Sequence, residues 1–557
     1  MFELVHEQAA NNALLIMNPL LIALSMAAAP LVAADWQYKS RPDLSPPILN
    51  ITIPATDETS PGFIFAAPFS GFPDKHHHGP RQDNPYIFTD KGELVWSGWG
   101  YYSVWAANFQ AAKYKGEDVL FSFEGSHNAY YGHGHGHVTL LNQNYETIGE
   151  LRAGNHKVAD KHEFHIVNEK TALLEIYQPV PIDLTPYGAT PKQQWIVEAV
   201  FQEVDIETGE LLFEWKSLDH ISPHESVLPV NEGQAGAGFN SSDAWDYFHI
   251  NSVDKDDEGN YLLSARNAAS IYKINGTSGE VIWKLGGLPA ITSSSFESNF
   301  NFSFQHHARW IKKDGSKEII SFFDNSAQGT ENRDGNVVHY NPTSSGKIIE
   351  VNASKQVAKL IKEYLPPDDL LSKSQGSTQV LPNGNAFINW GSSGAVTEFN
   401  YDGTPIFHAY FDSGSLGENV QNYRAFKYNW TGIPNEDIAV FSENTKDGDT
   451  NVYVSWNGDT RTKIWKIYSL KENGEKELLG SKNKTGFETK LTLKHTTKDE
   501  IFVESFTEND ELLGTSRSIK SQIQILPYEA EQSEKVQWTE NFSNYFEWRI
   551  FKDILGH

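Results

Sequence analysis

A strand–turn–strand pattern that recurs along most of the chain limits the folds open to it. Six segments alternate apolar and polar residues on both sides of a turn that carries Gly, Asn, Asp or Thr: residues 86–96, 138–151, 203–215, 272–285, 337–351 and 397–411. This pattern predicts β-hairpins. The turn glycines from Gly209 to Gly403 recur at spacings of roughly 57 to 70 residues, which leaves room for long loops in a repeat architecture.

A further strand pair precedes most of these hairpins, and each pair plus its hairpin predicts a four-stranded unit. The pairs are 108–114 with 118–125, 162–167 with 171–177, 246–254 with 261–267, 304–311 with 318–325, and 376–381 with 385–391. A sixth pair, 423–430 with 437–443, lacks a hairpin of its own, and residues 62–98 can supply it. We therefore expect an all-β fold, a six-bladed β-propeller closed by strands from both ends of the chain, which leaves no exposed sheet edge.

The strand pattern changes after Thr445, where short alternating segments predict an additional C-terminal β-sandwich of immunoglobulin or fibronectin type. The expected organisation is a signal peptide (1–34), an N-terminal extension (35–59), the propeller (60–445), the sandwich-like module (446–527) and a tail (528–557). The stretch from Lys216 to Trp245 is rich in Gly, Pro and Ser and predicts a functional loop over one face.

The net charge and the lack of cysteine limit the classes of partner and of chemistry open to this chain. The chain has 45 Lys and Arg against 72 Asp and Glu, a net charge of −27, and no cysteine. Such a surface repels nucleic acid and anionic membranes, so a small molecule is the expected partner. The absence of cysteine excludes disulfides, thiolate metal sites, iron–sulfur clusters and cysteine nucleophiles.

The apolar run 13–34 ends in Val32-Ala33-Ala34 and predicts a signal peptide cleaved before Asp35; a transmembrane anchor is the alternative. We expect a secreted or lumenal protein with no stable membrane insertion after cleavage. Glycosylation sequons support this expectation and lie at Asn50, Asn240, Asn275, Asn301, Asn352, Asn429, Asn483 and Asn541.

Polar residues on the predicted innermost strands are the candidate site, because those strands converge on the channel of a propeller. They are Gln110, His162, Glu163, His165, His249, Asn251, Gln305, His306, His307, Gln375 and Arg424. Each taken singly is explained by hydrogen bonds among the channel residues and solvent. For His249 and His306 together we favour a functional role.

A second histidine group, His133, His135 and His137, alternates with glycine, so on one strand the three imidazoles would share a face. The alternative is a glycine-rich strand that runs close to another segment. No carboxylate or fourth ligand is evident nearby, so we expect no metal and no cofactor. The adjacent residues His76, His77 and His78 are weaker candidates, because neighbouring strand residues point to opposite faces.

Residues 246–287, 304–325 and 375–391 together resemble the fungal branch of the arylsulfotransferase family, and the resemblance extends from about Tyr86 to beyond Gly514. It implies a six-bladed propeller with its active site at the channel mouth. Bacterial members of that family move a sulfuryl group between phenols through a covalent sulfohistidine. By motif, the resemblance implies that His249 and His306 stabilise the transferring group, with Arg333 as the arginine.

The nucleophilic histidine of the family has no counterpart here. The chain has no histidine between His339 and His408, and Ser374, Gln375 and Ser377 occupy the corresponding strand. Three functions therefore stay open. The first is aryl sulfotransfer, with Trp245, Trp390 and Tyr423 stacking on a phenol ring. The second is a cofactor-free cyclase or dehydratase of secondary metabolism, for example of hetero-Diels–Alder type. The third is a propeller that only binds.

Overall fold

The computed structural model describes residues 35–71, 79–102, 105–128, 132–329 and 336–523. Strands account for 48% and helices for 4%, so the predicted all-β class is confirmed. The helices are short: η1 (Thr185–Tyr187), α2 (Ser217–His220), η2 (Pro223–Glu225), η3 (Ser241–Asp243), η4 (Gly391–Ser393) and η5 (Gly414–Asn419). No helix in the described part of the chain combines the length and hydrophobicity needed to cross a bilayer.

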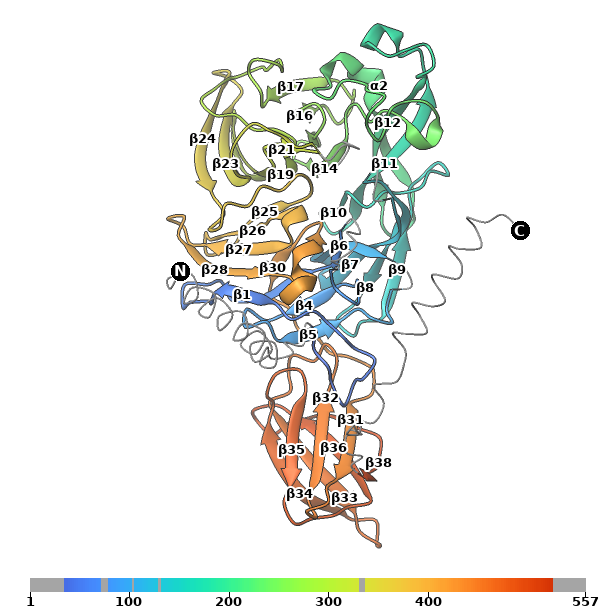
Figure 1. The fold of residues 1–557 in the computed structure, drawn as a ribbon, viewed down its shortest axis with the longest axis vertical. Helices are drawn as coiled ribbons and strands as arrows, with labels where there is room; N and C mark the ends of the chain where they lie inside the picture. Colours follow the sequence, from blue (N-terminus) through green and yellow to red (C-terminus); the bar gives the residue numbers. More distant parts are fainter. Residues whose placement is uncertain (1–34, 72–78, 103–104, 129–131, 330–335, 524–557) are drawn as a thin grey trace, which may run out of the picture.

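Three sheets in succession are built from consecutive antiparallel strands (Figure 1). The first contains β6 (Ala106–Tyr114), β7 (Glu117–His127), β8 (Gly134–Leu141) and β9 (Thr147–Leu151). The second contains β10 (Phe164–Val167), β11 (Thr171–Pro181), β12 (Trp195–Asp205) and β13 (Leu211–Lys216). The third contains β14 (Ile250–Lys255), β15 (Tyr261–Ala265), β16 (Ser270–Ile274) and β17 (Val281–Gly286).

Two further sheets gain an edge strand from elsewhere. The fourth has β19 (His306–Asp314), β20 (Lys317–Asp324), β23 (Ser345–Asn352) and β24 (Val357–Tyr364), with β18 (Glu297–Ser298) parallel to β24. The fifth has β25 (Ser377–Val380), β26 (Ala386–Asn389), β27 (Ala395–Phe399) and β28 (Pro405–Tyr410), with β1 (Asn50–Ile53) beside β28.

The sixth sheet joins distant parts of the chain. Here β30 (Phe426–Tyr428) pairs with β2 (Phe63–Ala66), which is followed by β4 (Tyr86–Phe88) and β5 (Leu94–Ser97). Two small ladders complete this part of the molecule: β3 (Pro68–Ser70) with β29 (Val420–Asn422), and β21 (Ala327–Gln328) with β22 (Val338–His339).

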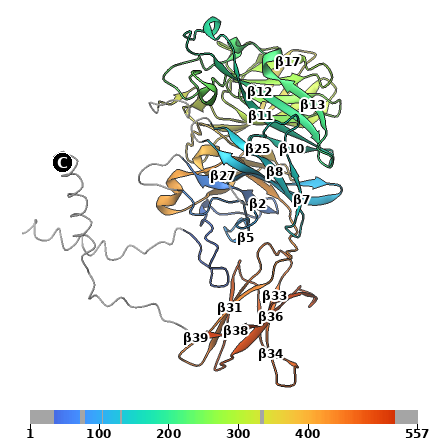
Figure 2. The same ribbon diagram turned by 90° about the vertical axis from the view of Figure 1, so that its right-hand side faces the viewer.

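The C-terminal strands form two sheets at one end of the molecule, below β4 and β5 in Figure 1 and again in the turned view of Figure 2. One contains β31 (Ala439–Asn444), β32 (Thr450–Ser455), β35 (Thr489–Leu493) and β39 (Gln522–Ile523). The other contains β33 (Ile464–Leu470), β34 (Lys476–Asn483), β36 (Glu500–Phe506) and β37 (Leu512–Thr515), with β38 (Ile519–Lys520) also paired to β36.

Two predicted strand pairings are wrong. Residues 437–443 do not pair with 423–430, because the turn in which Thr445 N–H bonds to the Asp449 carbonyl folds β31 onto β32 and places it in the C-terminal sheets. Residues 337–351 are not a hairpin. The hairpin there is β23 with β24, and Gly346 lies inside β23, where an added Cβ would be 2.4 Å from Cδ1 of Ile388. This glycine allows close sheet packing rather than a turn.

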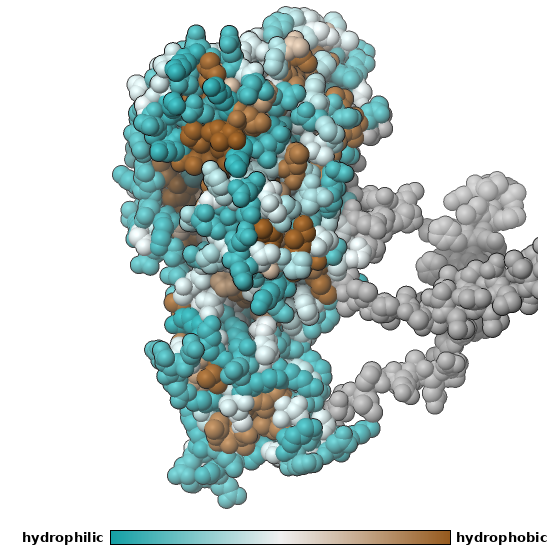
Figure 3. Space-filling view, turned by 90° about the vertical axis from the view of Figure 1, so that its left-hand side faces the viewer, coloured by the Kyte–Doolittle hydropathy of each residue, from teal (hydrophilic) through white to brown (hydrophobic). Residues whose placement is uncertain are grey.

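Apolar side chains fill the space between neighbouring sheets. One core cluster joins the second and third sheets through Phe201, Trp215, Val253, Tyr261 and Tyr272. The surface is mostly hydrophilic, as Figure 3 shows for the face at the left of Figure 1, with hydrophobic patches between the polar side chains. Several buried polar residues lie where the first strands of the sheets meet, among them Asn108, Glu163, Asn251, His306 and Arg424, and these strands position the candidate site.

Candidate functional site

Arg424, just before β30, connects the first strands of several sheets. Its Nη1 donates to Oε1 of Glu163 (2.9 Å) and Oδ1 of Asn108 (3.4 Å), and its Nη2 donates to the carbonyl of Asn251 (2.6 Å). Oε2 of Glu163 also accepts from Nη2 of Arg309 at 2.7 Å. Arg424 and Glu163 are each 1% exposed. The first strands of the sheets therefore meet around a buried ionic centre.

His306, the first residue of β19, ties the fourth sheet to the fifth. Its Nδ1 donates to Oδ1 of Asn325 (2.6 Å), and its Nε2 accepts from the backbone N–H of Gln375 (3.2 Å). Because both ring nitrogens have partners, this geometry corresponds to a neutral ring of one tautomer. Burial, followed by the nearby Arg266 charge, holds the pKa of His306 well below its usual value.

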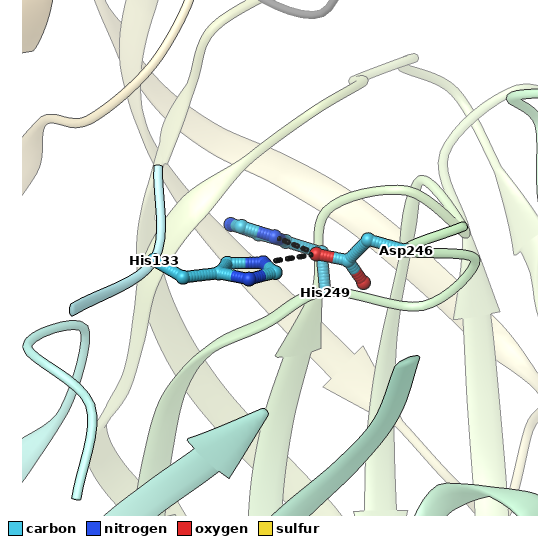
Figure 4. Close-up of side chains that lie close together, drawn as sticks. All are labelled: His133, Asp246 and His249. Carbon is cyan, nitrogen blue, oxygen red and sulfur yellow. Dashed lines mark hydrogen bonds and ion pairs between the residues drawn. The ribbon is translucent and has the colours of Figure 1, made fainter. Parts of the chain in front are cut away.

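His249 lies beside a carboxylate and a second histidine (Figure 4). Oδ2 of Asp246 is 2.5 Å from Nδ1 of His249 and 2.9 Å from Nε2 of His133. The three side chains are 9%, 15% and 18% exposed for His249, Asp246 and His133. Burial lowers the pKa of His249, an effect partly opposed by Asp246. For Asp246 the two imidazoles outweigh burial and hold its pKa below the usual value.

Tyr177 of β11 packs against both imidazoles of this group. Its ring centroid lies 4.2 Å from that of His133 and 5.2 Å from that of His249, in stacked geometry. Its hydroxyl donates to the carbonyl of Ile250, at the start of β14. Tyr177 thus fixes the two rings relative to each other.

A third histidine, His162, adjoins this group. Its Nδ1 donates to Oδ1 of Asp160, and its Nε2 lies 3.1 Å from Nζ of Lys161. That Nζ lies 4.5 Å from the ring centroid of Tyr423. Burial lowers the pKa of Lys161 to about 8. A buried lysine of this kind can exchange a proton near neutral pH.

The ring of Tyr423 lies among the histidines. Its centroid is 5.3 Å from that of His162 and 6.5 Å from that of His306, and the His162 and His249 centroids are 4.8 Å apart. Within the described residues the Tyr423 hydroxyl is buried without a hydrogen-bond partner. The structure thus brings together His162, His249 and His306 from three sheets around one tyrosine.

A small cavity adjoins the Asp246 group. Its volume is about 30 Å³, enough for roughly one water molecule. Its lining includes His133, Asp246 and His249 together with Leu228, Gln234 and Trp245. The latter residues belong to the predicted Lys216–Trp245 loop, which therefore covers this group.

Most remaining sequence candidates lie in or near the same centre. Asn251 donates from Nδ2 to the carbonyl of Gln305 (2.7 Å), and the His307 ring centroid is 5.3 Å from that of Phe426. His165 lies farther out, with its side chain 34% exposed. These residues line the converging strands, and the groups around Tyr423 and Asp246 bring several imidazoles together with further titratable side chains.

The aromatic residues predicted to stack on a substrate ring lie in different environments. Trp245 lines the small cavity, and its indole Nε1 donates to the carbonyl of Leu228. Trp390 is instead fully buried in a core with Phe323 and Phe399, so the structure removes it from the substrate-stacking set. Arg333 lies outside the described residues, as do His76, His77 and His78.

The three alternating histidines do not form one site. His133 precedes β8, where the chain turns at Gly132 with φ of 73°, and it alone of the three meets the Asp246 carboxylate. His135 is exposed, and Nε2 of His137 lies 3.9 Å from Oε2 of Glu150. The glycine-rich alternative holds for the strand itself, because an added Cβ at Gly136 would meet the Glu124 carbonyl at 2.1 Å.

The sequons differ in accessibility. Asn50, Asn240, Asn301, Asn429 and Asn483 are exposed, and Asn275 is half-buried. Asn352 is only 6% exposed, and its Oδ1 accepts from Oγ of Ser354, so a glycan does not fit the folded surface there. Asn541 and the predicted signal peptide lie outside the described residues.

The site contains residues that the sequence reasoning missed. Asp246 lies three positions before His249, and this Asp–His spacing was an available signal. Lys161 lies next to the predicted channel residue His162. Tyr177 lies on the second strand of its sheet, and no local pattern distinguishes it from a core residue.

Comparison with known proteins identifies the family to which the chain belongs. The model of the family described as arylsulfotransferase (ASST) matches residues 110–412. The chain belongs to the arylsulfotransferase family. The matched span contains the Asp246 group, Lys161, His162 and His306, whereas Tyr423 and Arg424 follow it. No curated protein matches the chain.

Several solved structures are similar to this arylsulfotransferase-family chain at low identity. A protein of unknown function from Bacteroides caccae is 10% identical with a TM-score of 0.36, over 66% of this chain and 98% of its own. A protein from Lactobacillus plantarum is 10% identical with a TM-score of 0.30, over 77% and 97%. A GH43 protein from Bacillus licheniformis is 8% identical with a TM-score of 0.28, over 75% and 89%.

Proposed function

We propose that this chain is an aryl sulfotransferase-like enzyme that acts on a phenolic small molecule where the first strands converge. The observation that carries the proposal is the meeting of His162, His249 and His306, from three sheets, around Tyr423 and Lys161. Family membership supports the reaction class. Aromatic side chains and fixed hydrogen-bond donors are what a phenol and a transferring sulfuryl group require.

The proposal includes an architecture. The six sheets are the blades of a propeller, and the pairing of β30 with β2 closes its ring. The two C-terminal sheets are a sandwich-like module. The proposal also includes a location and a branch: a secreted glycoprotein that belongs to the fungal branch of the family. The exposed glycosylation sequons are compatible with secretion.

The chemistry we propose is direct transfer. The bond between the donor's aryl oxygen and sulfur breaks and releases the donor as its phenolate, while the acceptor's phenolic oxygen bonds to sulfur. The acceptor's proton passes to the neutral amine form of Lys161, which the lowered pKa of this lysine makes accessible. A covalent sulfohistidine is not required. Nε2 of His306 accepts a hydrogen bond from the backbone N–H of Gln375, and Nδ1 of His249 is hydrogen-bonded to Asp246. Nε2 of His249 is therefore the imidazole nitrogen that we propose faces the transferring group.

The experiment supplies an aryl sulfate such as 4-nitrophenyl sulfate together with a free phenol and measures both released nitrophenol and the new sulfate ester. His249→Ala and Lys161→Met are expected to lose transfer at least about tenfold each. Lys170→Met changes an exposed lysine between β10 and β11 and is expected to retain transfer. With a sulfate group chiral through oxygen isotopes, direct transfer inverts the configuration at sulfur, whereas two covalent steps retain it. Absence of transfer with several donors and acceptors contradicts the proposal.

One observation favours a second function. Both ring nitrogens of His306 have hydrogen-bond partners, and the side-chain amide of Gln375, just before β25, is bonded to Gln421. Neither side chain is therefore free to accept a sulfuryl group. The imidazoles and aromatic rings that converge at this site are also groups suited to the dehydration or cyclisation of a phenolic or quinone-methide-like intermediate without any cofactor. Product formation in the absence of a sulfate donor, lost on His249→Ala, distinguishes this function from sulfotransfer.

A further inference from the structure

We infer that His133, Asp246 and His249 form a binding site for one divalent transition-metal ion, with Zn²⁺ the best match to the donor set. The sequence predicts no metal, because the carboxylate is absent from the histidine-rich stretch itself. The fold supplies it from a segment 113 residues away. The inference goes beyond the proposed reaction, and metal binding is independent of whether sulfate is transferred.

The geometry suits a single ion. One ligand atom from each side chain lies within 4.8 Å of the other two. Oδ2 of Asp246 lies 2.9 Å from Nε2 of His133 and 2.5 Å from Nδ1 of His249. Each imidazole thus directs one ring nitrogen at the same carboxylate oxygen, as Figure 4 shows. An ion with metal–ligand distances of about 2.0–2.2 Å needs only a small separation of these atoms.

Neighbouring groups hold the three side chains in place, which lowers the cost of assembling a metal site. The ring of Tyr177 stacks on both imidazoles. Nδ2 of Asn267 donates to the backbone carbonyl of Asp246 at 2.7 Å. On the other side, the backbone N–H of Gly134 donates to Oδ2 of Asp160 at 2.5 Å and fixes the chain next to His133.

The chemistry of the donors selects the class of ion. Two imidazole nitrogens and one carboxylate oxygen are borderline and hard ligands that suit Zn²⁺ and its first-row neighbours, whereas Ca²⁺ and Mg²⁺ prefer oxygen alone. Three protein ligands leave at least one position for water or substrate. The adjoining cavity of about 30 Å³ has room for one such molecule.

The other cluster of potential ligands, Asp160, His162 and Glu175, is a weaker metal site. Nδ1 of His162 is bonded to Asp160, and Nε2 lies 3.1 Å from the Lys161 ammonium, whose positive charge opposes a nearby dication. All three side chains are at most 4% exposed. We assign this cluster the role of supporting the His133 segment through Asp160.

Metal binding changes what His249 presents to the pocket. Without an ion, Nδ1 carries the hydrogen that Asp246 accepts. With an ion on Nδ1, the hydrogen of the neutral ring resides on Nε2, so His249 becomes a donor toward the pocket. A donor there suits an anionic sulfuryl group. This consequence rests on the proposed function, whereas the metal site does not.

The test begins with the full-length purified protein, stripped of metal by a chelator and then dialysed. Titration calorimetry with ZnCl₂ is expected to show one tight site per chain, and crystals grown with Zn²⁺ are expected to show an anomalous peak between His133 and Asp246. His133→Ala and Asp246→Ala are each expected to weaken binding by more than about 100-fold. Asp160→Asn, which alters the hydrogen bond that supports Gly134 beside His133 as well as the one from His162, is expected to weaken it about 10- to 100-fold.

Two controls isolate the site. His135→Ala removes an exposed histidine of the same stretch and is expected to bind Zn²⁺ like the parent protein. Joint replacement of His76, His77 and His78 by alanine removes the other histidine-rich segment and is also expected to leave the tight site unchanged. Circular dichroism and urea unfolding of the metal-free variants check that each one folds.

The outcomes separate the two proposals. No tight binding of Zn²⁺, Co²⁺, Mn²⁺ or Ni²⁺ to the folded parent overturns the inference, as does binding that survives His133→Ala unchanged or an anomalous peak elsewhere. Tight binding with no sulfotransfer keeps the metal site and rejects the reaction. Sulfotransfer that persists after complete metal removal keeps the reaction and rejects a role for the ion in it, while the calorimetry and the anomalous peak decide whether the site exists.

Discussion

Nη1 of Arg424 lies 2.9 Å from Oε1 of Glu163, although 261 residues separate them in the chain. The same carboxylate accepts from Arg309 through Oε2 and also from the backbone N–H of Val253. One buried carboxylate therefore forms ion pairs with two arginines from different sheets. This ionic centre holds the first strands of the sheets close together. The positions of the histidines near Tyr423 depend on how those strands are held.

Glu163→Gln is expected to destabilise the protein strongly, because the buried guanidinium of Arg424 and the half-buried one of Arg309 lose their counter-charge. The expected loss in the free energy of unfolding is about 3–5 kcal/mol, measured by urea denaturation. Asp118→Asn is the matched control, since Asp118 pairs with Lys113 at the surface with 2.9 Å between Nζ and Oδ1, and its loss is expected to cost below about 1 kcal/mol. Equal small losses in both variants would show that the buried centre does not stabilise the fold.

Gly136→Ala is expected to disturb the β7–β8 ladder, because the new Cβ would lie 2.1 Å from the carbonyl oxygen of Glu124. The expected cost is about 1–3 kcal/mol in the free energy of unfolding. Gly149 of β9 in the same sheet has nothing within 4 Å of such a Cβ, so Gly149→Ala is expected to be neutral or slightly stabilising. If the two variants unfold alike, close approach is not the reason for glycine at position 136.

Local patterns explain what the sequence could predict about the fold. The hairpins β16–β17 and β27–β28 form where turn glycines Gly279 and Gly403 predict them, because adjacent strands need only a short turn between them. The segment 337–351 misleads because Gly346 has a packing role that imitates a turn signal. Residues 437–443 alternate equally well for either neighbouring sheet, and only the turn after Asn444 decides between them.

The candidate site was predictable in part for the same reason. His249, His306 and Arg424 fall at the starts of first strands, so the strand pattern alone places them near a common centre. Asp246 and His133 meet through a contact between segments far apart in the chain, and the sequence offers no rule for that pairing. Tyr177 contributes through ring stacking on both of them, which depends on side-chain geometry rather than on strand periodicity.

Tyr423→Phe is expected to lower kcat/KM about tenfold, or by roughly 1.4 kcal/mol, without lowering stability. The Tyr423 hydroxyl is buried and has no hydrogen-bond partner among the described residues, so its removal costs the fold nothing and takes away a group available to substrate. Steady-state kinetics with the aryl sulfate and urea unfolding measure the two effects. Tyr102 has a similarly unpartnered hydroxyl but lies in the Trp96 core, and Tyr102→Phe is expected to change neither quantity.

Asp412 gives the protein a pH dependence of stability. Burial, followed by the charge of nearby Asp35, raises the pKa of the Asp412 carboxyl to about 7 from the ordinary 3.8. Because the folded state holds this proton more tightly than the unfolded state, the contribution is favourable at low pH and is lost as pH rises between these values. Asp412→Asn removes the titrating group, so its stability relative to the parent is expected to increase from about pH 5 to about pH 8.

Urea unfolding of both proteins across that interval measures this difference directly, and comparison at each pH cancels the titration of every other group that the two proteins share. The difference is expected to rise most between about pH 5 and pH 7, where the carboxyl is ionised in the unfolded chain but still largely protonated in the folded one, and to level off as the pH passes about 7. A difference that stays constant with pH would mean that Asp412 ionises alike in the folded and unfolded chains. A difference that falls as pH rises would mean that the folded protein stabilises the carboxylate instead.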